Sequence, residues 1–140
     1  MLYWDASALV SLCVEEQETA LLRRLVEGGI VTWAVSRVEI ASAIERRSRE
    51  GRLVPEARLR AIAALGELAD AWTEIQPIAP VCERALRLLA IHPLRAADAM
   101  QLAAALVAVS DQPRGHGFVC TDRRLREAAS REGFRIVPEM

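Results

Sequence analysis

The segment Leu2-Tyr3-Trp4-Asp5-Ala6-Ser7-Ala8 predicts a short apolar strand that ends at Asp5, where a helix begins. Other short apolar runs predict strands at residues 30–33, 73–76, 118–120 and 134–137. Helical patterns separate these strands, and such alternation indicates βαβ units. We therefore expect an α/β fold of three layers, with a parallel sheet flanked by helices. The chain has no internal repeat or low-complexity segment, so residues 1–140 are expected to form a single domain.

Helix boundaries follow from periodicity, glycine and proline. Gly28-Gly29 ends one helical pattern, Gly51 ends another, and Pro55 suits the first turn of the next. His92-Pro93 interrupts the chain before the longest apolar helix. The predicted helices cover residues 6–15, about 17–27, 36–50, 55–71, 80–91, 94–109 and 123–132.

Composition excludes several classes of protein. Hydrophobic residues make up 52% of the 140 residues and charged residues 26%, which is typical of a globular protein. All 18 basic residues are arginine, and the absence of lysine excludes a P-loop and argues against receiver or phosphatase sites that use lysine. The net charge of −1 is unlike that of a protein that coats nucleic acid, although a local basic patch remains compatible with it.

Cysteines and hydropathy indicate the compartment. Cys13, Cys82 and Cys120 are odd in number and widely spaced, so we expect them to be apolar fillers in a reducing cytosol. We see no charged-then-apolar leader, and the longest apolar-rich run, residues 99–109, is too short to span a bilayer. The expectation is a soluble, cytoplasmic protein without a membrane association.

Acidic residues follow two of the predicted strands. Asp5 and Asp122 each come directly after a strand and at the start of a helix. Ligands of open parallel sheets gather at the carboxyl ends of the strands, which favours a functional site there. Aspartate is also a preferred N-cap residue, so each residue taken alone is equally well explained as a helix cap.

Two more acidic residues lie inside predicted helices. Ser36-Arg37-Val38-Glu39 fits a capping box, which is the better explanation of Glu39 taken alone. Asp98 is the only charged residue between Arg95 and Asp111. A helix that is apolar on nearly every face is expected to be buried, and a buried aspartate needs an ion pair or a metal. A pair with Arg95 or another arginine is one explanation of Asp98, but we favour a functional carboxylate.

Together these segments resemble the PIN-domain family. The resemblance rests on Asp5-Ala6-Ser7-Ala8 after a strand, on Glu39 early in a helix, on residues 92–103 (His-Pro-Leu-Arg-Ala-Ala-Asp-Ala-Met-Gln-Leu-Ala) and on Phe118-Val119-Cys120-Thr121-Asp122. Length and spacing are similar to those of the VapC-type toxins of bacterial type II toxin–antitoxin pairs. The resemblance implies an Mg²⁺- or Mn²⁺-dependent endoribonuclease that acts on an RNA substrate. It also implies a homodimer and a cognate antitoxin as partners.

The resemblance also assigns roles to residues. Asp5, Glu39, Asp98 and Asp122 would be catalytic, with Asp5, Asp98 and Asp122 as metal ligands and Ser7 and Thr121 as supporting hydroxyls. Many relatives carry a further acidic residue just after the position of Asp122, where this chain has Arg123-Arg124-Leu125. That departure bears on whether a second metal is bound.

Carboxylates suit this chemistry because Mg²⁺ prefers carboxylate oxygens and retained waters, and a dication relieves the repulsion among them. Arginines after Glu39 and after Asp122, foremost Arg46 and Arg123, are candidates for binding phosphate, although a solvated helix face explains most of them as well. The alternative to a nuclease is a catalytically inactive PIN-like module that binds RNA or protein. Residues 59–68 and 85–91 could face a dimer mate or an antitoxin, or could be core.

Overall fold

The protein, described here by a computed structural model of residues 1–140, is built on one sheet of five parallel strands. The strands are β1 (Leu2–Trp4), β2 (Val31–Trp33), β3 (Thr73–Ile75), β4 (Gly117–Val119) and β5 (Arg135–Val137). The helices are α1 (Ala6–Cys13), α2 (Thr19–Arg23), the 3₁₀ turn η1 (Val26–Gly28), α3 (Ser36–Arg49), α4 (Pro55–Ala71), α5 (Ile78–Ile91), α6 (Ala96–Ala108) and α7 (Arg123–Glu132). The predicted α/β class with a parallel sheet flanked by helices is confirmed.

Helix boundaries match the sequence patterns most closely where proline or glycine marks them. α4 begins at Pro55 and α7 ends before Gly133, which has the positive φ of a C-terminal cap. The long helix expected from residue 17 to 27 is wrong, because α2 ends at Arg23 and a separate 3₁₀ turn follows. α1 stops at Cys13 instead of Glu15. The Thr19 hydroxyl donates to the Ser11 carbonyl oxygen (2.7 Å). If the helix continued, that carbonyl would instead accept from the backbone amide of Glu15.

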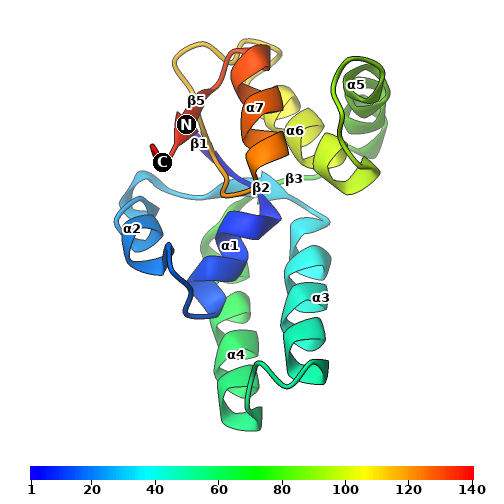
Figure 1. Ribbon diagram of the computed structural model, residues 1–140. Helices are drawn as coiled ribbons and strands as arrows, with labels where there is room; N and C mark the ends of the chain where they lie inside the picture. Colours follow the sequence, from blue (N-terminus) through cyan, green and yellow to red (C-terminus); the bar gives the residue numbers. More distant parts are fainter.

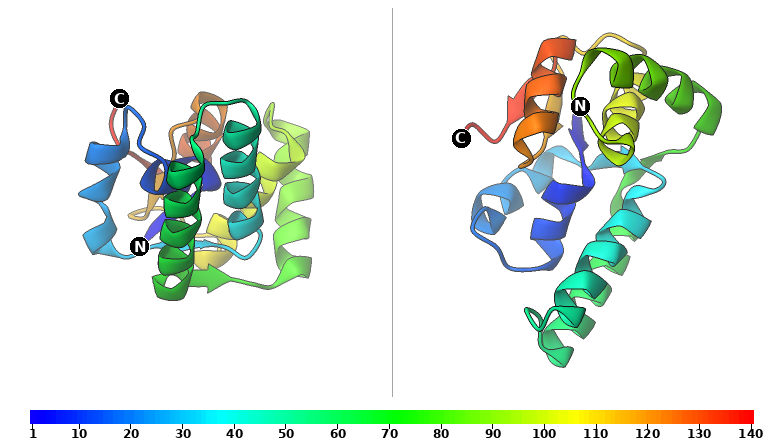
Figure 2. Two further views of the ribbon diagram at one scale, coloured as in Figure 1. Left: turned by 90° about the horizontal axis from the view of Figure 1, so that it is seen from below. Right: turned by 45° about the vertical axis from the view of Figure 1, so that its right-hand side comes forward.

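Each face of the sheet carries its own layer of helices. Successive side chains on a strand point to opposite faces, so Tyr3 and Trp4 are both fully buried but belong to different cores. Tyr3 packs with residues of α5, α6 and α7, and Trp4 packs with residues of α1, α3 and α4. Figure 1 shows the first group of helices above the sheet and the second group below it. The α3–α4 hairpin projects from the body, with its two helices side by side in Figure 1 and in the left view of Figure 2.

The strand order positions a ligand site. The sheet runs β3-β2-β1-β4-β5, so the chain moves outward from β1 in one direction and then crosses back to start β4 on the other side of β1. Tyr3 pairs with Val31 of β2 and with Phe118 of β4. Such a reversal opens a crevice at the carboxyl ends of the two central strands. Asp5 and Asp122 follow those two strands, with Asp122 three residues beyond the end of β4.

No helix of the protein combines the length and the apolar character that crossing a bilayer would require.

Candidate metal and active site

A polar pocket of about 280 Å³ lies at the carboxyl ends of β1 and β4. All four acidic residues singled out in the sequence line it, together with both hydroxyl residues assigned a supporting role. The lining residues are Asp5, Ala6, Ser7, Val10, Ser11, Glu16, Glu18, Glu39, Ala43, Arg46, Arg47, Asp98, Gln101, Thr121 and Asp122. Residues separated by more than a hundred positions in the chain therefore face one cavity.

Asp5 forms the buried floor of the pocket and is 3% exposed. Its carboxylate caps α1 by accepting from the Ala8 amide (3.0 Å), and it also accepts from the Ser7 hydroxyl (2.7 Å) and the Cys120 thiol (3.2 Å). Burial raises the pKa of Asp5 to about 6, against the lowering effect of these hydrogen bonds, and the nearby Asp98 adds to the rise. Asp5 therefore both caps α1 and lines the pocket.

Glu39 comes from the first turn of α3 and is not part of a capping box. That explanation is wrong because the N-cap is Val35, without a side-chain cap, and the Ser36 hydroxyl bonds to Thr32 and Gln101 instead. The Glu39 carboxylate accepts from the Gln101 amide nitrogen (3.2 Å). Burial raises the pKa of Glu39 to about 7, with further contributions from Asp5 and Asp98.

Asp98 lies in the first turn of α6 and is only half-buried, so the expectation of an aspartate enclosed by an apolar helix is wrong. The apolar core of α6 starts after it, at Ala99, and an acidic residue in a first turn is favoured by the helix dipole. Asp98 forms no ion pair, which also excludes the pair with Arg95. Burial and Asp122 raise its pKa, and Arg95 opposes them.

Asp122 stands at the rim of the pocket. It is exposed, and its carboxylate caps α7 by accepting from the Leu125 amide (3.0 Å). Its neighbour Thr121 donates to the Ser7 hydroxyl (3.4 Å), which in turn donates to Asp5. The ends of β1 and β4 are thereby joined through two hydroxyl groups.

The donor chemistry of this pocket fits a hard divalent cation. Asp5, Glu39, Asp98 and Asp122 offer only carboxylate oxygens, and no arginine forms an ion pair with any of them. No three His, Cys, Asp or Glu side chains are already close enough to form a complete ligand group. Mg²⁺ is compatible with that spacing because it keeps several waters and takes only one or two carboxylates directly.

Comparison with known proteins identifies the family. The PIN domain model matches residues 2–131. The chain belongs to the PIN-domain family. Two curated relatives from Mycobacterium tuberculosis, named Ribonuclease VapC45 (strain CDC 1551 / Oshkosh) and Ribonuclease VapC49 (strain H37Rv), are each 33% identical to it over 150 aligned positions. Each alignment covers 99% of this chain and 95% of the relative. The family resemblance drawn from the sequence is confirmed.

Two solved structures of low sequence identity share the fold of this chain. The crystal structure of PAE2754 from Pyrobaculum aerophilum superimposes with a TM-score of 0.69 at 19% identity, covering 97% of this chain and 88% of that one. The crystal structure of FitAcB from Neisseria gonorrhoeae gives 0.62 at 14% identity, covering 97% and 96%.

The arginines around the pocket of this PIN domain differ in their surroundings. Arg46 lines the pocket and has no acidic partner, whereas Arg47 lines it but pairs with Glu16 (3.4 Å). Arg123 lies outside the pocket: its side chain is 91% exposed and pairs with Glu127. Of the two foremost arginine candidates, the structure therefore places Arg46 beside the carboxylates and Arg123 away from them.

Two residues that contact the carboxylates were not assigned a role from the sequence. Cys120 was expected to be a filler, but it donates its thiol proton to Asp5, and burial together with Asp5 raises the pKa of this thiol, so it stays protonated. Gln101 contacts Glu39. One signal for Gln101 was present: it is a polar residue in an apolar helix, three positions after Asp98 and hence on the same face.

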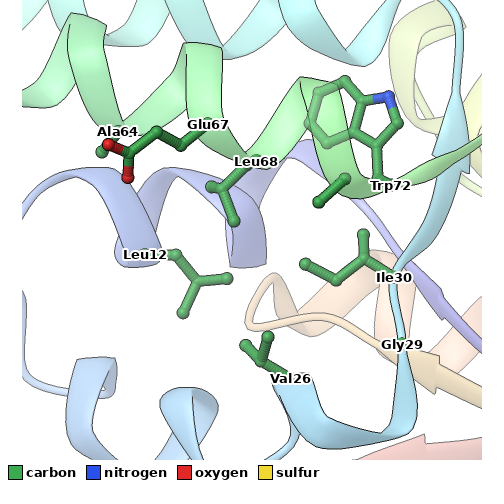
Figure 3. Close-up of a pocket in the computed structure, with 9 residues that line it drawn as sticks. Leu12, Val26, Gly29, Ile30, Ala64, Glu67, Leu68 and Trp72 are labelled. Carbon is green, nitrogen blue, oxygen red and sulfur yellow. The ribbon is translucent and has the colours of Figure 1, made fainter.

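A second cavity of this PIN domain, of about 310 Å³, carries no such chemistry. Figure 3 shows the apolar side chains of Leu12, Val26, Ile30 and Leu68 facing one another across it, with Trp72 at its edge. Glu67 is its only ionisable lining residue. The cluster of carboxylates therefore distinguishes the polar pocket from this apolar cavity.

Proposed function

We propose that the protein is a metal-dependent endoribonuclease and the toxin of a type II toxin–antitoxin pair. The observation that carries this proposal is the convergence of four carboxylates from four separate elements in one pocket without an arginine paired to them. Membership of the PIN-domain family and the names of the two VapC ribonucleases support RNA as the substrate.

In this proposal Asp5 and Asp98 would bind Mg²⁺ or Mn²⁺ directly, Asp122 would complete the site or hold a second ion, and Glu39 would bind through a water molecule. A divalent cation supplies two things when bound there: it lowers the pKa of a coordinated water, and it neutralises negative charge on the phosphate. The raised pKa values of Asp5 and Glu39 reflect the cost of keeping these carboxylates charged, which a dication would relieve.

The side chains have separable tasks. Ser7 and Cys120 both donate to the Asp5 carboxylate and so hold it in place. Glu39, which lines the pocket and is held by Gln101, would hold the attacking water and accept its proton. Arg46, free of an acidic partner, would hold a phosphate oxygen of the RNA. No side-chain nucleophile is required.

For partners, we propose an RNA substrate, a cognate antitoxin and a second copy of the chain in a homodimer. The basis is the similarity to VapC proteins. We further propose that residues 1–140 act as a single domain and that the protein works in the cytoplasm.

The first test is metal-dependent cleavage. Purified protein incubated with a mixture of labelled RNA oligonucleotides should cut them when Mg²⁺ or Mn²⁺ is present and should stop when a chelator is added. Saturating Mn²⁺ should also raise the melting temperature, because a ligand at about 100 times its Kd stabilises the native state by about 2.7 kcal/mol. RNA binding without cleavage and without stabilisation by Mn²⁺ would instead favour an inactive binding module.

A second prediction separates the two arginine candidates. Arg46→Ala is expected to lower kcat/KM by about tenfold or more, since a charge-assisted hydrogen bond contributes about 1.5–3 kcal/mol. Arg123→Ala is the matched control and should leave kcat/KM unchanged, because that side chain is outside the pocket. Equal losses in both variants would contradict the role given to Arg46. The measurement is initial cleavage rate against RNA concentration.

A further inference from the structure

Gln101 is a buried polar residue at the back of the carboxylate pocket, with an exposure of 1%. It lies one turn along α6 from Asp98. Its side-chain amide makes three hydrogen bonds to three different residues. The Tyr3 hydroxyl donates to Oε1 (2.7 Å), while Nε2 donates to the Ser36 hydroxyl oxygen (2.9 Å) and to Glu39 Oε1 (3.2 Å).

These contacts fix which way the amide faces. A glutamine amide has one accepting end and one donating end with two N–H groups. An ionised carboxylate only accepts, so Glu39 requires the donating end of Gln101. The accepting end is then left for the Tyr3 hydroxyl, which points at it. Each N–H of the amide has its own acceptor, and Glu39 has no other hydrogen-bond partner for its side chain.

The hydrogen bonds continue beyond Gln101. Ser36 shares a 2.7 Å hydrogen bond with Thr32, and the Thr32 hydroxyl donates to the Trp4 carbonyl oxygen (2.7 Å). The set Tyr3–Gln101–Ser36–Thr32 thus connects β1, β2, α3 and α6. Asp5 follows β1 directly, Glu39 is on α3, and Asp98 is on α6. The elements that carry three of the four carboxylates are therefore tied together by one buried set of hydrogen bonds.

We propose that Gln101 is a positioning residue that holds the Glu39 carboxylate in the orientation required for metal binding and water activation. This inference rests on the proposed nuclease function. A glutamate on a helix surface samples several rotamers, and fixing it at the moment of binding costs free energy. Because Tyr3 and Ser36 hold the Gln101 amide in place, the Glu39 carboxylate is already oriented before a metal binds, and this cost is not incurred at binding. Groups that orient metal ligands in this way typically change metal affinity or activity by about 10–100-fold when they are mutated.

The decisive variant is Gln101→Met, which keeps an unbranched side chain of similar length but cannot donate to Glu39. The concentration of Mn²⁺ that gives half of the maximal rise in melting temperature should increase about tenfold or more, and kcat should fall by a similar factor. Leu102→Ala is the matched control, because Leu102 is equally buried in α6 and does not line the pocket. It should lower the melting temperature while leaving half-saturation by Mn²⁺ unchanged.

Tyr3→Phe provides a second variant should Gln101→Met fail to fold. Phenylalanine keeps the ring that stacks on Phe118 (centroids 5.4 Å apart) and removes only the hydroxyl that holds the amide carbonyl. The Mn²⁺ concentration that gives half of the maximal rise in melting temperature should increase here too, by a smaller factor than in Gln101→Met.

The outcomes separate this inference from the proposed function. Wild-type protein that neither cleaves RNA nor is stabilised by Mn²⁺ overturns both. Wild-type protein that does both, alongside a folded Gln101→Met variant with unchanged half-saturation and kcat, overturns only the role of Gln101. With Gln101→Met unfolded, an unchanged half-saturation in Tyr3→Phe overturns it equally.

Discussion

Asp5→Asn is expected to abolish RNA cleavage and, at the same time, to stabilise the metal-free protein above about pH 7. The loss of activity should be at least about 10³-fold, or about 4 kcal/mol of transition-state stabilisation, because the substitution removes a negatively charged metal ligand. The gain in stability is expected because the buried carboxylate, with its pKa raised to about 6, is kept charged there at a cost in free energy. Asparagine retains an oxygen that can accept from the Ala8 amide and so can still cap α1.

The two readouts of Asp5→Asn distinguish a functional carboxylate from a structural one. Cleavage rates measured with Mn²⁺ and urea unfolding measured without metal, on the same preparations, give both. A purely structural helix cap would show little change in either stability or activity, because asparagine caps a helix about as well as aspartate. Asp98→Asn should show the same pattern with a smaller gain in stability, since Asp98 is only half-buried. A variant at either position that cleaves RNA at the wild-type rate would remove that carboxylate from the mechanism.

Stability of the metal-free protein is expected to fall as the pH rises from about 4 to about 7. The pKa of Asp5 is raised from 3.8 to about 6 in the folded protein, and that of Glu39 from 4.5 to about 7. For each residue, at a pH between its unfolded and its folded pKa, the carboxyl group keeps its proton in the folded protein but has lost it in the unfolded protein. Their stabilising contribution is therefore complete below about pH 4 and is lost as the pH passes the folded pKa. For Asp5 the loss amounts to at most about 3 kcal/mol, and less for the partly exposed Glu39.

Urea unfolding of wild type and Asp5→Asn at a series of pH values measures this contribution as the difference between the two proteins. The difference should change across the window from about pH 4 to 7, because removing the Asp5 charge also lowers the pKa of Glu39, and be flat above it. Arginine partners help to hold the pKa values of Glu132 and Asp111 low, so these residues also lose their stabilising contribution at acidic pH. Both proteins share this loss, and it therefore cancels in the difference between them. In wild type, saturating Mn²⁺ should remove the fall in stability with rising pH. A constant difference at every pH would show that Asp5 is not held at a raised pKa.

Local sequence patterns determined the scaffold. Short apolar runs, helical periodicity, Pro55 and Gly133 predicted the strands and most helix boundaries, because these signals depend only on neighbouring residues. The helix of residues 6–15 was predicted too long, since the Thr19 hydroxyl takes the Ser11 carbonyl, and residues 17–27 form α2 and a separate 3₁₀ turn instead of one helix. Asp5 and Asp122 could be placed at one edge of the sheet because parallel strands put their carboxyl ends together.

The tertiary structure alone decided what those carboxylates contact. The hydrogen bonds from Tyr3 to Gln101 and from Cys120 to Asp5 join residues 98 and 115 positions apart, and no periodicity encodes such pairs. The same holds for Glu39, whose local pattern suggested a capping box, whereas in the fold the Gln101 amide of α6 donates to both Ser36 and Glu39. Sequence thus specified the elements and the acidic residue types, through signals within a few residues. Packing specified the orientation and the pKa of each carboxylate, because burial and hydrogen bonding depend on segments that meet only in the folded chain.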